Sequence, residues 1–217
     1  MHIKKAEYLI SSPSFDKCPI ADRSEYAFIG RSNVGKSSLI NMLCNNERLA
    51  KTSNSPGKTQ MINHFEITSA KKIGEYNETN WYLVDLPGYG FAKISQGSRR
   101  RWEQMIENYL RKRENLVDVF VLIDSRHSPQ KIDLEFIHKL GLWRVPFTLV
   151  FTKSDKEKQR TVSQNVKSFL ASLRETQQFL PQHFVTSAIK KTGREKILNL
   201  ISEKNDDAKT SGFVRSF

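Results

Sequence analysis

The segment GRSNVGKSS, residues 30–38, has the residue types and the spacing of a loop that binds phosphate. Gly30 and Gly35 permit a backbone path whose N–H groups turn inward toward phosphate oxygens, and the N-terminus of the following helix adds partial positive charge. Lys36 can then reach the outer phosphates, and the Ser37 hydroxyl can bind Mg²⁺. The residues that we assign to this nucleotide site are Gly30, Arg31, Ser32, Asn33, Val34, Gly35, Lys36, Ser37 and Ser38.

The segment VDLPGYG, residues 84–90, predicts a buried strand that ends on a carboxylate and then turns through proline and glycine. Asp85 lies where a carboxylate would hold Mg²⁺ through water, and the backbone N–H of Gly88 can approach a γ-phosphate. By itself D-x-x-G is a common turn sequence. Its value comes from its order after the phosphate loop and its place at a strand end.

A polar loop, SPGKTQ at residues 55–60, lies between these two motifs. Thr59 could supply a second hydroxyl to Mg²⁺ when a γ-phosphate is present, and we place Gly57 in the same site. The alternative is that Thr59 is an ordinary loop threonine.

The segment TKSD, residues 152–155, also follows a predicted strand, so these loops should open at one edge of the sheet, where α/β proteins bind ligands. Asp155 can accept hydrogen bonds from N1–H and the 2-amino group of guanine, whereas adenine offers no such pair of donors. Lys153 can lay its stem along the ring, and Ser187 and Ala188 can present a backbone N–H to the guanine O6. This set predicts GTP or GDP as the ligand, because adenine would leave a buried carboxylate unpaired.

Apolar runs bounded by turn residues alternate with helical periods along the chain. This alternation predicts an α/β fold of the P-loop NTPase type, a three-layer sandwich with helices on both faces of a mostly parallel sheet. The link between the predicted strands at 62–68 and 80–85 is too short for a crossover helix, so these strands should form an antiparallel hairpin. We expect strands at 25–30, 62–68, 80–85, 117–124, 147–152 and 183–188, an edge strand at 6–11, and helices at 36–45, 98–113, 130–141, 161–173 and 193–204.

With 217 residues, 38% of them hydrophobic, the chain suits one domain with a filled core. We expect residues 1–24 to pack on this domain, residues 25–204 to form the GTP-binding domain, and residues 205–217 to be a flexible tail, because they are polar and interrupted by glycine. The sequence shows no secretory signal, no apolar run of the roughly 20 residues that span a bilayer, and no metal-ligand spacing of its two cysteines. These features predict a cytoplasmic protein that does not enter the membrane.

The 35 Lys and Arg residues exceed the 23 Asp and Glu residues, and the net charge of +12 favours a polyanionic partner. Basic clusters lie at 99–101, 111–113 and 190–191. We expect them to bind RNA mainly through phosphate contacts, with Tyr89 and Phe91 as further candidates. The alternative is that the charge only keeps the protein soluble.

The combination of GRSNVGKSSLIN, SPGKTQ, DLPGYGFA, DSRHSPQ, TKSDK and SAIKKTG resembles the EngB family of bacterial GTPases, from about residue 6 to residue 204. The resemblance implies a cytoplasmic GTPase that acts in assembly of the large ribosomal subunit, with the subunit precursor, rRNA and ribosomal proteins as partners, and it implies a link to cell division and septation. We expect a monomer. Thr152 stands where most GTPases carry the asparagine of N-K-x-D; EngB proteins commonly have threonine here, and its single hydroxyl predicts modest guanine affinity.

Tyr89 directly follows the glycine of DLPG, where Ras-like switches carry a glutamine that orients the attacking water. A phenol cannot both accept from and donate to that water, so intrinsic hydrolysis should be slow. We expect help from K⁺ held near Asn33, the residue type that GTPases with a catalytic K⁺ carry at this position, or from a ribosomal partner. The alternative is that Asn33 only caps its own loop. The catalytic set is then Asn33, Lys36, Thr59 and Gly88.

Two other classes of protein compete with this interpretation. A P-loop kinase or ATPase would also need Lys36 and Mg²⁺, but the TKSD segment argues against adenine. An rRNA-binding protein with a weak or vestigial nucleotide site would show a GDP affinity near zero.

Overall fold

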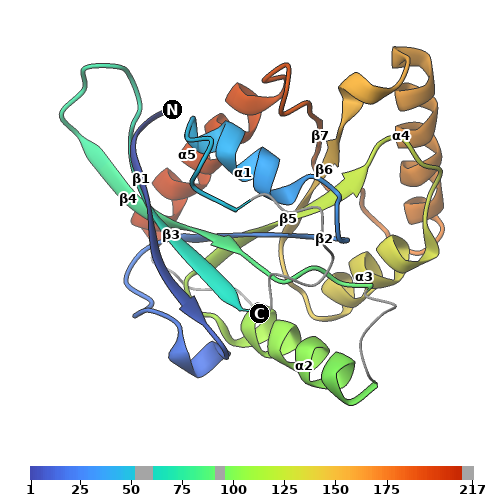
Figure 1. Cartoon of the computed structure of the whole chain (residues 1–217), viewed down its shortest axis with the longest axis horizontal. Coiled ribbons are helices and arrows are strands. Elements are labelled where there is room, and N and C mark those ends of the chain that lie inside the picture. The colour runs from blue at the N-terminus through green and yellow to red at the C-terminus, as the bar shows by residue number, and fades with distance from the viewer. Residues whose placement is uncertain (52–60, 91–95, 212–217) are drawn as a thin grey trace.

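The computed structural model describes residues 1–51, 61–90 and 96–211, in which seven strands form one sheet. The strand order is β1-β3-β4-β2-β5-β6-β7 (Figure 1). Strand β3 runs antiparallel to both of its neighbours and the other pairs are parallel, which confirms the predicted hairpin in a mostly parallel sheet. The strands are β1 His2–Ser12, β2 Glu25–Gly30, β3 Ile62–Ala70, β4 Glu78–Asp85, β5 Leu116–Asp124, β6 Phe147–Thr152 and β7 His183–Val185.

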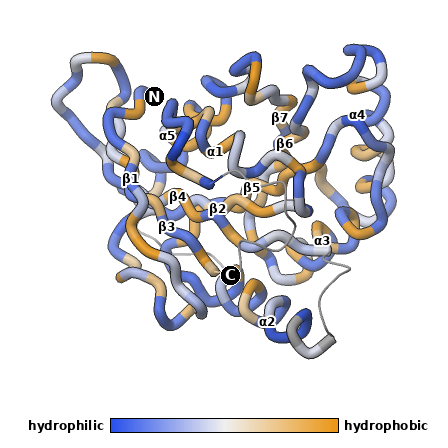
Figure 2. Tube along the Cα trace, in the orientation of Figure 1, coloured by the Kyte–Doolittle hydropathy of each residue, from blue (hydrophilic) through white to orange (hydrophobic). Residues whose placement is uncertain are grey.

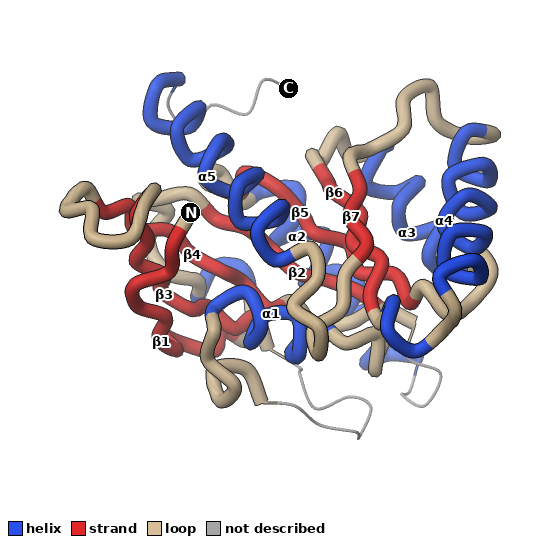
Figure 3. Tube along the Cα trace, turned by 90° about the horizontal axis from the view of Figure 1, so that it is seen from above, coloured by secondary structure: helices blue, strands red, loops and turns tan. Residues whose placement is uncertain are grey.

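Five α-helices of the described residues cover the two faces of this sheet. Helices α1 and α5 pack on one face, and α2, α3 and α4 pack on the other (Figure 1). Seen from above in Figure 3, α1 and α5 lie over the strands. The expected three-layer α/β sandwich is therefore confirmed. The helices are α1 Lys36–Cys44, α2 Gln96–Lys112, α3 Lys131–Leu142, α4 Gln159–Arg174 and α5 Arg194–Ser211.

The central strands are apolar because helices cover both of their faces. All six residues of β2 are buried. Ala27 and Ile29 belong to the core beneath α2, α3 and α4, whereas Tyr26 and Phe28 belong to the core beneath α1 and α5. Figure 2 shows the hydrophobic colour concentrated along β2 and β5. This double core fixes the strand ends from which the predicted ligand-binding loops begin. In the described ranges, no helix combines the length and the apolar character needed to cross a membrane.

The N-terminal strand is longer than predicted. Instead of covering 6–11, β1 pairs with β3 from His2 to Ser12 and forms an edge of the same sheet. Within residues 1–24, the 11 residues of β1 therefore belong to the sheet of the domain itself. The register of β1 shifts twice, and Lys4 and Lys5 are exposed on it. Bulges and lysines of this kind discourage pairing with a further strand.

The C-terminal helix contradicts the tail predicted from residue 205. Helix α5 continues to Ser211, and Asn205 is buried, where its side-chain oxygen accepts a hydrogen bond from the Tyr26 hydroxyl at 3.0 Å. Lys209 donates to the Thr79 hydroxyl at 2.8 Å. Polar composition suggested a loose tail, but contacts with distant strands stabilise the additional turns. Residues 212–217 lie outside the described part of the chain.

A buried ion cluster fastens the end of α2 to the start of β2. The carboxylate of Glu25 accepts hydrogen bonds from Arg113 Nη2 at 2.7 Å and Nε at 2.8 Å and from the Tyr109 hydroxyl at 2.8 Å, and His64 Nε2 lies 3.0 Å away. Burial works to raise the pKa of Glu25, but hydrogen bonds from Arg113 and His64 outweigh it and lower the pKa to about 2. Arg113 is therefore not part of the basic surface expected at 111–113.

Replacing Arg113 by alanine should lower the free energy of unfolding by about 3–5 kcal/mol at pH 7, because it leaves a buried carboxylate without its partner. The folded-state pKa of Glu25 lies below its usual value of 4.5, so its stabilisation is present above about pH 4.5 and is lost as the pH falls toward 2. In urea unfolding, the difference in free energy of unfolding between wild type and R113A should therefore shrink as the pH is lowered through that range. The control is Arg111→Ala, since Arg111 is exposed and pairs with Glu107; it should cost less than about 1 kcal/mol. Equal losses in the two variants would contradict the role of the cluster.

Candidate nucleotide site

The phosphate loop, residues 30–38, joins the end of β2 to the start of α1 as its motif requires. Gly35 has φ +104° and Asn33 has φ +61°, so the backbone takes left-handed conformations at two points of the loop. A Cβ at Gly30 would lie 2.8 Å from the backbone oxygen of Leu122, which excludes any larger residue there. The loop thus leads directly into the N-terminal turn of α1, whose N–H groups have no partner within the helix.

Asp85 lies beside the phosphate loop because β4 pairs with β2, where Asp85 is opposite Phe28. Its carboxylate, 5% exposed, forms an ion pair with the ammonium group of Lys36. Gly88 is buried just beyond the strand end. Lys36, which the sequence assigned to the outer phosphates, and Asp85, which it assigned to the metal, therefore lie together.

The donor atoms at this point fit Mg²⁺. The Ser37 hydroxyl, in the first turn of α1, and the Asp85 carboxylate are the hard oxygen ligands that Mg²⁺ prefers. Within the described ranges, no group of three or more His, Cys, Asp or Glu side chains could hold a metal ion. Mg²⁺ in nucleotide sites takes one or two protein oxygens together with phosphate and water. The other predicted ligand, Thr59, and its neighbour Gly57 lie outside the described residues.

The base loop, residues 152–155, is tied to the phosphate loop. The Thr152 hydroxyl donates to the backbone oxygen of Val34 at 2.6 Å, and the Lys153 ammonium donates to the backbone oxygen of Asn33. A Cβ at Gly35 would lie 3.6 Å from Lys153 Cε, so the lysine stem passes over that glycine. The Thr152 hydroxyl thus tethers the base loop to the phosphate loop.

Asp155 lies in a short 3-10 turn after β6, and its side chain is 8% exposed. A hydrogen bond from Ser187 Oγ at 2.7 Å lowers the pKa of Asp155, so the carboxylate stays ionised at neutral pH. Because β7 ends before the predicted boundary at residue 188, Ser187 and Ala188 lie in a loop. The backbone N–H of Ser187 donates to the Thr192 oxygen at 3.3 Å, which leaves Ala188 as the better-placed donor for a base.

Asp124, the last residue of β5, is a site residue that the sequence reasoning missed. Its carboxylate accepts hydrogen bonds from Lys153 Nζ at 2.9 Å and from Arg126 Nε and Nη2 at 2.9 and 2.8 Å. Burial works to raise the pKa of Asp124, but bonds from Arg126 and Lys153 lower it to about 2. Ser125 donates to the Thr152 backbone oxygen at 2.7 Å. The position of DSRHSPQ at a strand end was the signal that could have identified both residues.

Tyr89 and Asn33, the two residues considered for a part in hydrolysis, differ in their contacts: Tyr89 is hydrogen-bonded and Asn33 is exposed. The Tyr89 hydroxyl donates to Asp133 Oδ1 in α3 at 2.8 Å. The Asn33 side chain is exposed and takes part in none of the side-chain hydrogen bonds found among the described residues. The alternative that Asn33 only caps its own loop therefore gains no support.

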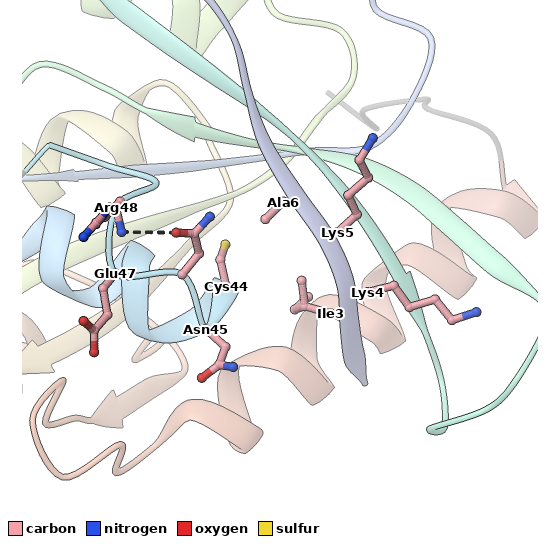
Figure 4. Close-up of a pocket in the computed structure, with 9 residues that line it drawn as sticks. Ile3, Lys4, Lys5, Ala6, Cys44, Asn45, Glu47 and Arg48 are labelled. Atoms are coloured by element: carbon pink, nitrogen blue, oxygen red, sulfur yellow. Dashed lines mark hydrogen bonds between the residues drawn. The ribbon is translucent and has the colours of Figure 1, made fainter.

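A separate hollow of about 480 Å³ lies between β1 and the C-terminal end of α1, at the opposite end of that helix from the phosphate loop. In Figure 4 the side chains of Lys4 and Lys5 extend away from Cys44 and Asn45, and the lining of the hollow contains no residue of the phosphate loop or of the base loop. We therefore place the nucleotide at the sheet edge and not here.

Sequence comparison with known proteins assigns this chain to a family. The chain is 52% identical over 215 residues to the "Probable GTP-binding protein EngB" of Flavobacterium psychrophilum, which covers 98% of this chain and 100% of that protein. It is 50% identical over 210 residues to the protein of the same description from Porphyromonas gingivalis, covering 97% and 100%. The sequence profile of the family described as 50S ribosome-binding GTPase matches residues 25–153. The chain belongs to the EngB family of GTP-binding proteins.

Solved structures agree with the fold of this EngB family member. A probable GTP-binding protein engB has a TM-score of 0.57 and 23% identity, covering 85% of this chain and 100% of that one. Era in complex with MgGDPNP and part of 16S ribosomal RNA has a TM-score of 0.63 and 23% identity, covering 83% of this chain and 56% of Era. At this identity the likeness concerns the fold.

Membership of the EngB family makes GTP or GDP the ligand, and this gives Asp124 a testable role. Asp124→Asn keeps the shape of the side chain but removes the charge that holds Lys153. GDP affinity, measured by titration calorimetry, should fall about tenfold, since a hydrogen bond between charged groups is lost. The matched control is Glu157→Gln, an exposed acid after the base loop, which should bind as wild type does. Unchanged GDP affinity in Asp124→Asn would refute the role.

Proposed function

We propose that this protein is a switch that binds and hydrolyses GTP in the cytoplasm and acts in assembly of the bacterial large ribosomal subunit. The observation that carries the proposal is the junction of the phosphate loop with the base loop. Thr152 and Lys153 bond to carbonyl oxygens of the phosphate loop, and Asp155 lies at the same edge of the sheet. A junction of this kind suits one ligand that carries both a base and phosphates.

The base that this site suits is guanine. Asp155 is ionised and can accept from the guanine N1–H and 2-amino group at once, while Ala188 offers a backbone N–H to O6. Lys153 is held so that its stem passes over Gly35, near the path from phosphate to base. Adenine would leave the Asp155 carboxylate unpaired, and the affinity for ADP should be correspondingly low.

We assign Mg²⁺ to Ser37 and Asp85, with Thr59 as an additional ligand in the triphosphate state. Bound there, Mg²⁺ neutralises charge on the β and γ phosphates. Lys36 is already within reach of Asp85 and would share its charge with the outer phosphates. The backbone N–H of Gly88 would approach the γ-phosphate, so the DLPG loop, residues 85–90, would respond to hydrolysis.

Hydrolysis by the protein alone should be slow. Tyr89 replaces the glutamine of Ras-like switches, and its hydroxyl is already bonded to Asp133. Phosphoryl transfer depends on positioning and on neutralising charge, and a cation from outside can supply the second. The exposed Asn33 amide is available to a K⁺ ion beside the phosphates, and a ribosomal partner could supply the same charge.

We propose rRNA and ribosomal proteins of the large-subunit precursor as partners. Arg100 and Arg101 in α2 and Lys190 and Lys191 after β7 are exposed in a chain of net charge +12. The matching family is described as ribosome-binding, and Era, a structural neighbour, was crystallised with ribosomal RNA. We expect the protein to act as a monomer. The link to cell division rests on the family resemblance alone.

Asp155→Asn should weaken GDP binding by about 100-fold and give measurable binding of XDP, because the amide can donate to the carbonyl oxygen at C2 of xanthine. Binding of GDP, XDP and ADP is measured by calorimetry for both proteins. The matched control is again Glu157→Gln, which should keep guanine preference. Unchanged preference in Asp155→Asn would refute the assignment of the base, and a wild-type GDP affinity near zero would favour an RNA-binding protein with a vestigial site.

GTP hydrolysis should be faster in KCl than in NaCl of equal ionic strength, or faster with large-subunit particles, by about tenfold or more. Asn33→Ala should abolish stimulation by K⁺ and leave stimulation by particles. Stimulation by particles should weaken as NaCl rises, because contacts with RNA phosphates release counterions. Phosphate release is measured in KCl and in NaCl, each with and without large-subunit particles. If neither K⁺ nor the particles stimulate hydrolysis, both proposed sources of the missing cation are refuted.

A further inference from the structure

Asp133, in the first turn of α3, is fully buried and lies where the phosphate loop and the DLPG loop meet. Its Oδ1 accepts a hydrogen bond from Arg31 Nε of the phosphate loop at 3.0 Å and another from the Tyr89 hydroxyl at 2.8 Å. Its second oxygen, Oδ2, is buried and accepts no bond from the described residues. One carboxylate oxygen therefore joins two loops that border the nucleotide.

The backbone supports the same junction. Arg31 and Tyr89 form an isolated parallel β-bridge, which extends the pairing of β2 with β4 beyond the ends of both strands. The Tyr89 ring stacks on Phe136, one turn further along α3, with centroids 4.2 Å apart and planes at 17°. The ring is therefore held from its face while its hydroxyl is held by Asp133.

The chain directly after Tyr89 is equally constrained. Gly90 has φ +80°, and a Cβ there would lie 2.6 Å from Ile132 Cδ1 of α3. The DLPG loop thus passes against the Ile132 side chain in the first turn of α3, and the positive φ of Gly90 favours glycine at this position. Gly88 comes immediately before Tyr89, so the tether fixes the segment whose N–H group would meet a γ-phosphate.

We propose that Asp133 is a positioning residue that anchors the phosphate loop and the DLPG loop to α3, and that Tyr89 is its tether and does not handle the attacking water. This inference rests on the proposed GTPase function. The tether matters most when a γ-phosphate is present, because only then does the DLPG loop contact the nucleotide. The affinity for GDP should therefore depend little on the hydrogen bond between Tyr89 and Asp133.

A double-mutant cycle of Tyr89→Phe and Asp133→Ala tests this proposal. Tyr89→Phe removes only a hydroxyl, and it should lower single-turnover GTP hydrolysis and affinity for a non-hydrolysable GTP analogue about five- to tenfold, with GDP affinity changed less than about twofold. In the Asp133→Ala background, the same tyrosine substitution should have no further effect. If Asp133→Ala fails to fold, Asp133→Asn replaces it in the cycle. Its amide oxygen is a weaker acceptor than the carboxylate, so the fold-loss caused by Tyr89→Phe should shrink to about a third in this background.

Two control variants distinguish this role from general damage. Tyr76→Phe removes a hydroxyl from a side chain that is 96% exposed, and Glu135→Gln removes a charge from an exposed residue of α3; both should behave as wild type. If the fold-losses of the two single variants multiply in the double variant, Tyr89 acts on the reaction without Asp133. That result would overturn the proposal. So would a Tyr89→Phe variant that hydrolyses GTP normally. Failure of the wild type to bind GDP would instead overturn the proposed function.

Discussion

Two backbone oxygens of the phosphate loop, those of Asn33 and Val34, accept hydrogen bonds from side chains of the base loop, and the nucleotide site depends on them. The two loops begin at different strands, β2 and β6, which are separated in the sheet by β5. The sheet places the loops at one edge, but it does not fix the distance between the phosphate and base subsites. The Thr152 and Lys153 side chains fix that distance, and Asp124 fixes Lys153 in turn.

Charge in the site is balanced by local pairs. Asp85 pairs with Lys36, and Asp124 pairs with Lys153 and Arg126, so each buried carboxylate has a cation beside it. An unpaired buried carboxylate would be costly, which explains why these acids lie next to basic residues. The pairs also mean that the site supplies little net positive charge of its own. A triphosphate must therefore be neutralised mainly by the helix N-terminus, the loop amides and the metal ion.

The fold was largely predictable because its pattern is local. Apolar runs and helical periods located the strands and helices, and the spacing of the phosphate motif located its loop. The polar partners were not predictable, because they come from distant parts of the chain. Arg113 was expected on a basic surface but lies in the core against Glu25, and Asn205 was expected in a tail but bonds to Tyr26. Periodicity indicates which face of an element is buried; it does not indicate which buried polar group finds a partner.

The use of Tyr89 as a tether has a consequence for the chemistry of hydrolysis. A glutamine at this position serves the attacking water, whereas here the side chain stabilises the loop and is bonded to Asp133. The same carboxylate also accepts a hydrogen bond from Nε of Arg31, the arginine of the phosphate loop. Lys36 of the phosphate loop pairs with Asp85, the carboxylate to which we assign Mg²⁺. In the GTPase that we propose, Lys36 and one Mg²⁺ would share the charge that develops on the transferred phosphoryl group, so a further cation supplied from outside should raise the rate of hydrolysis.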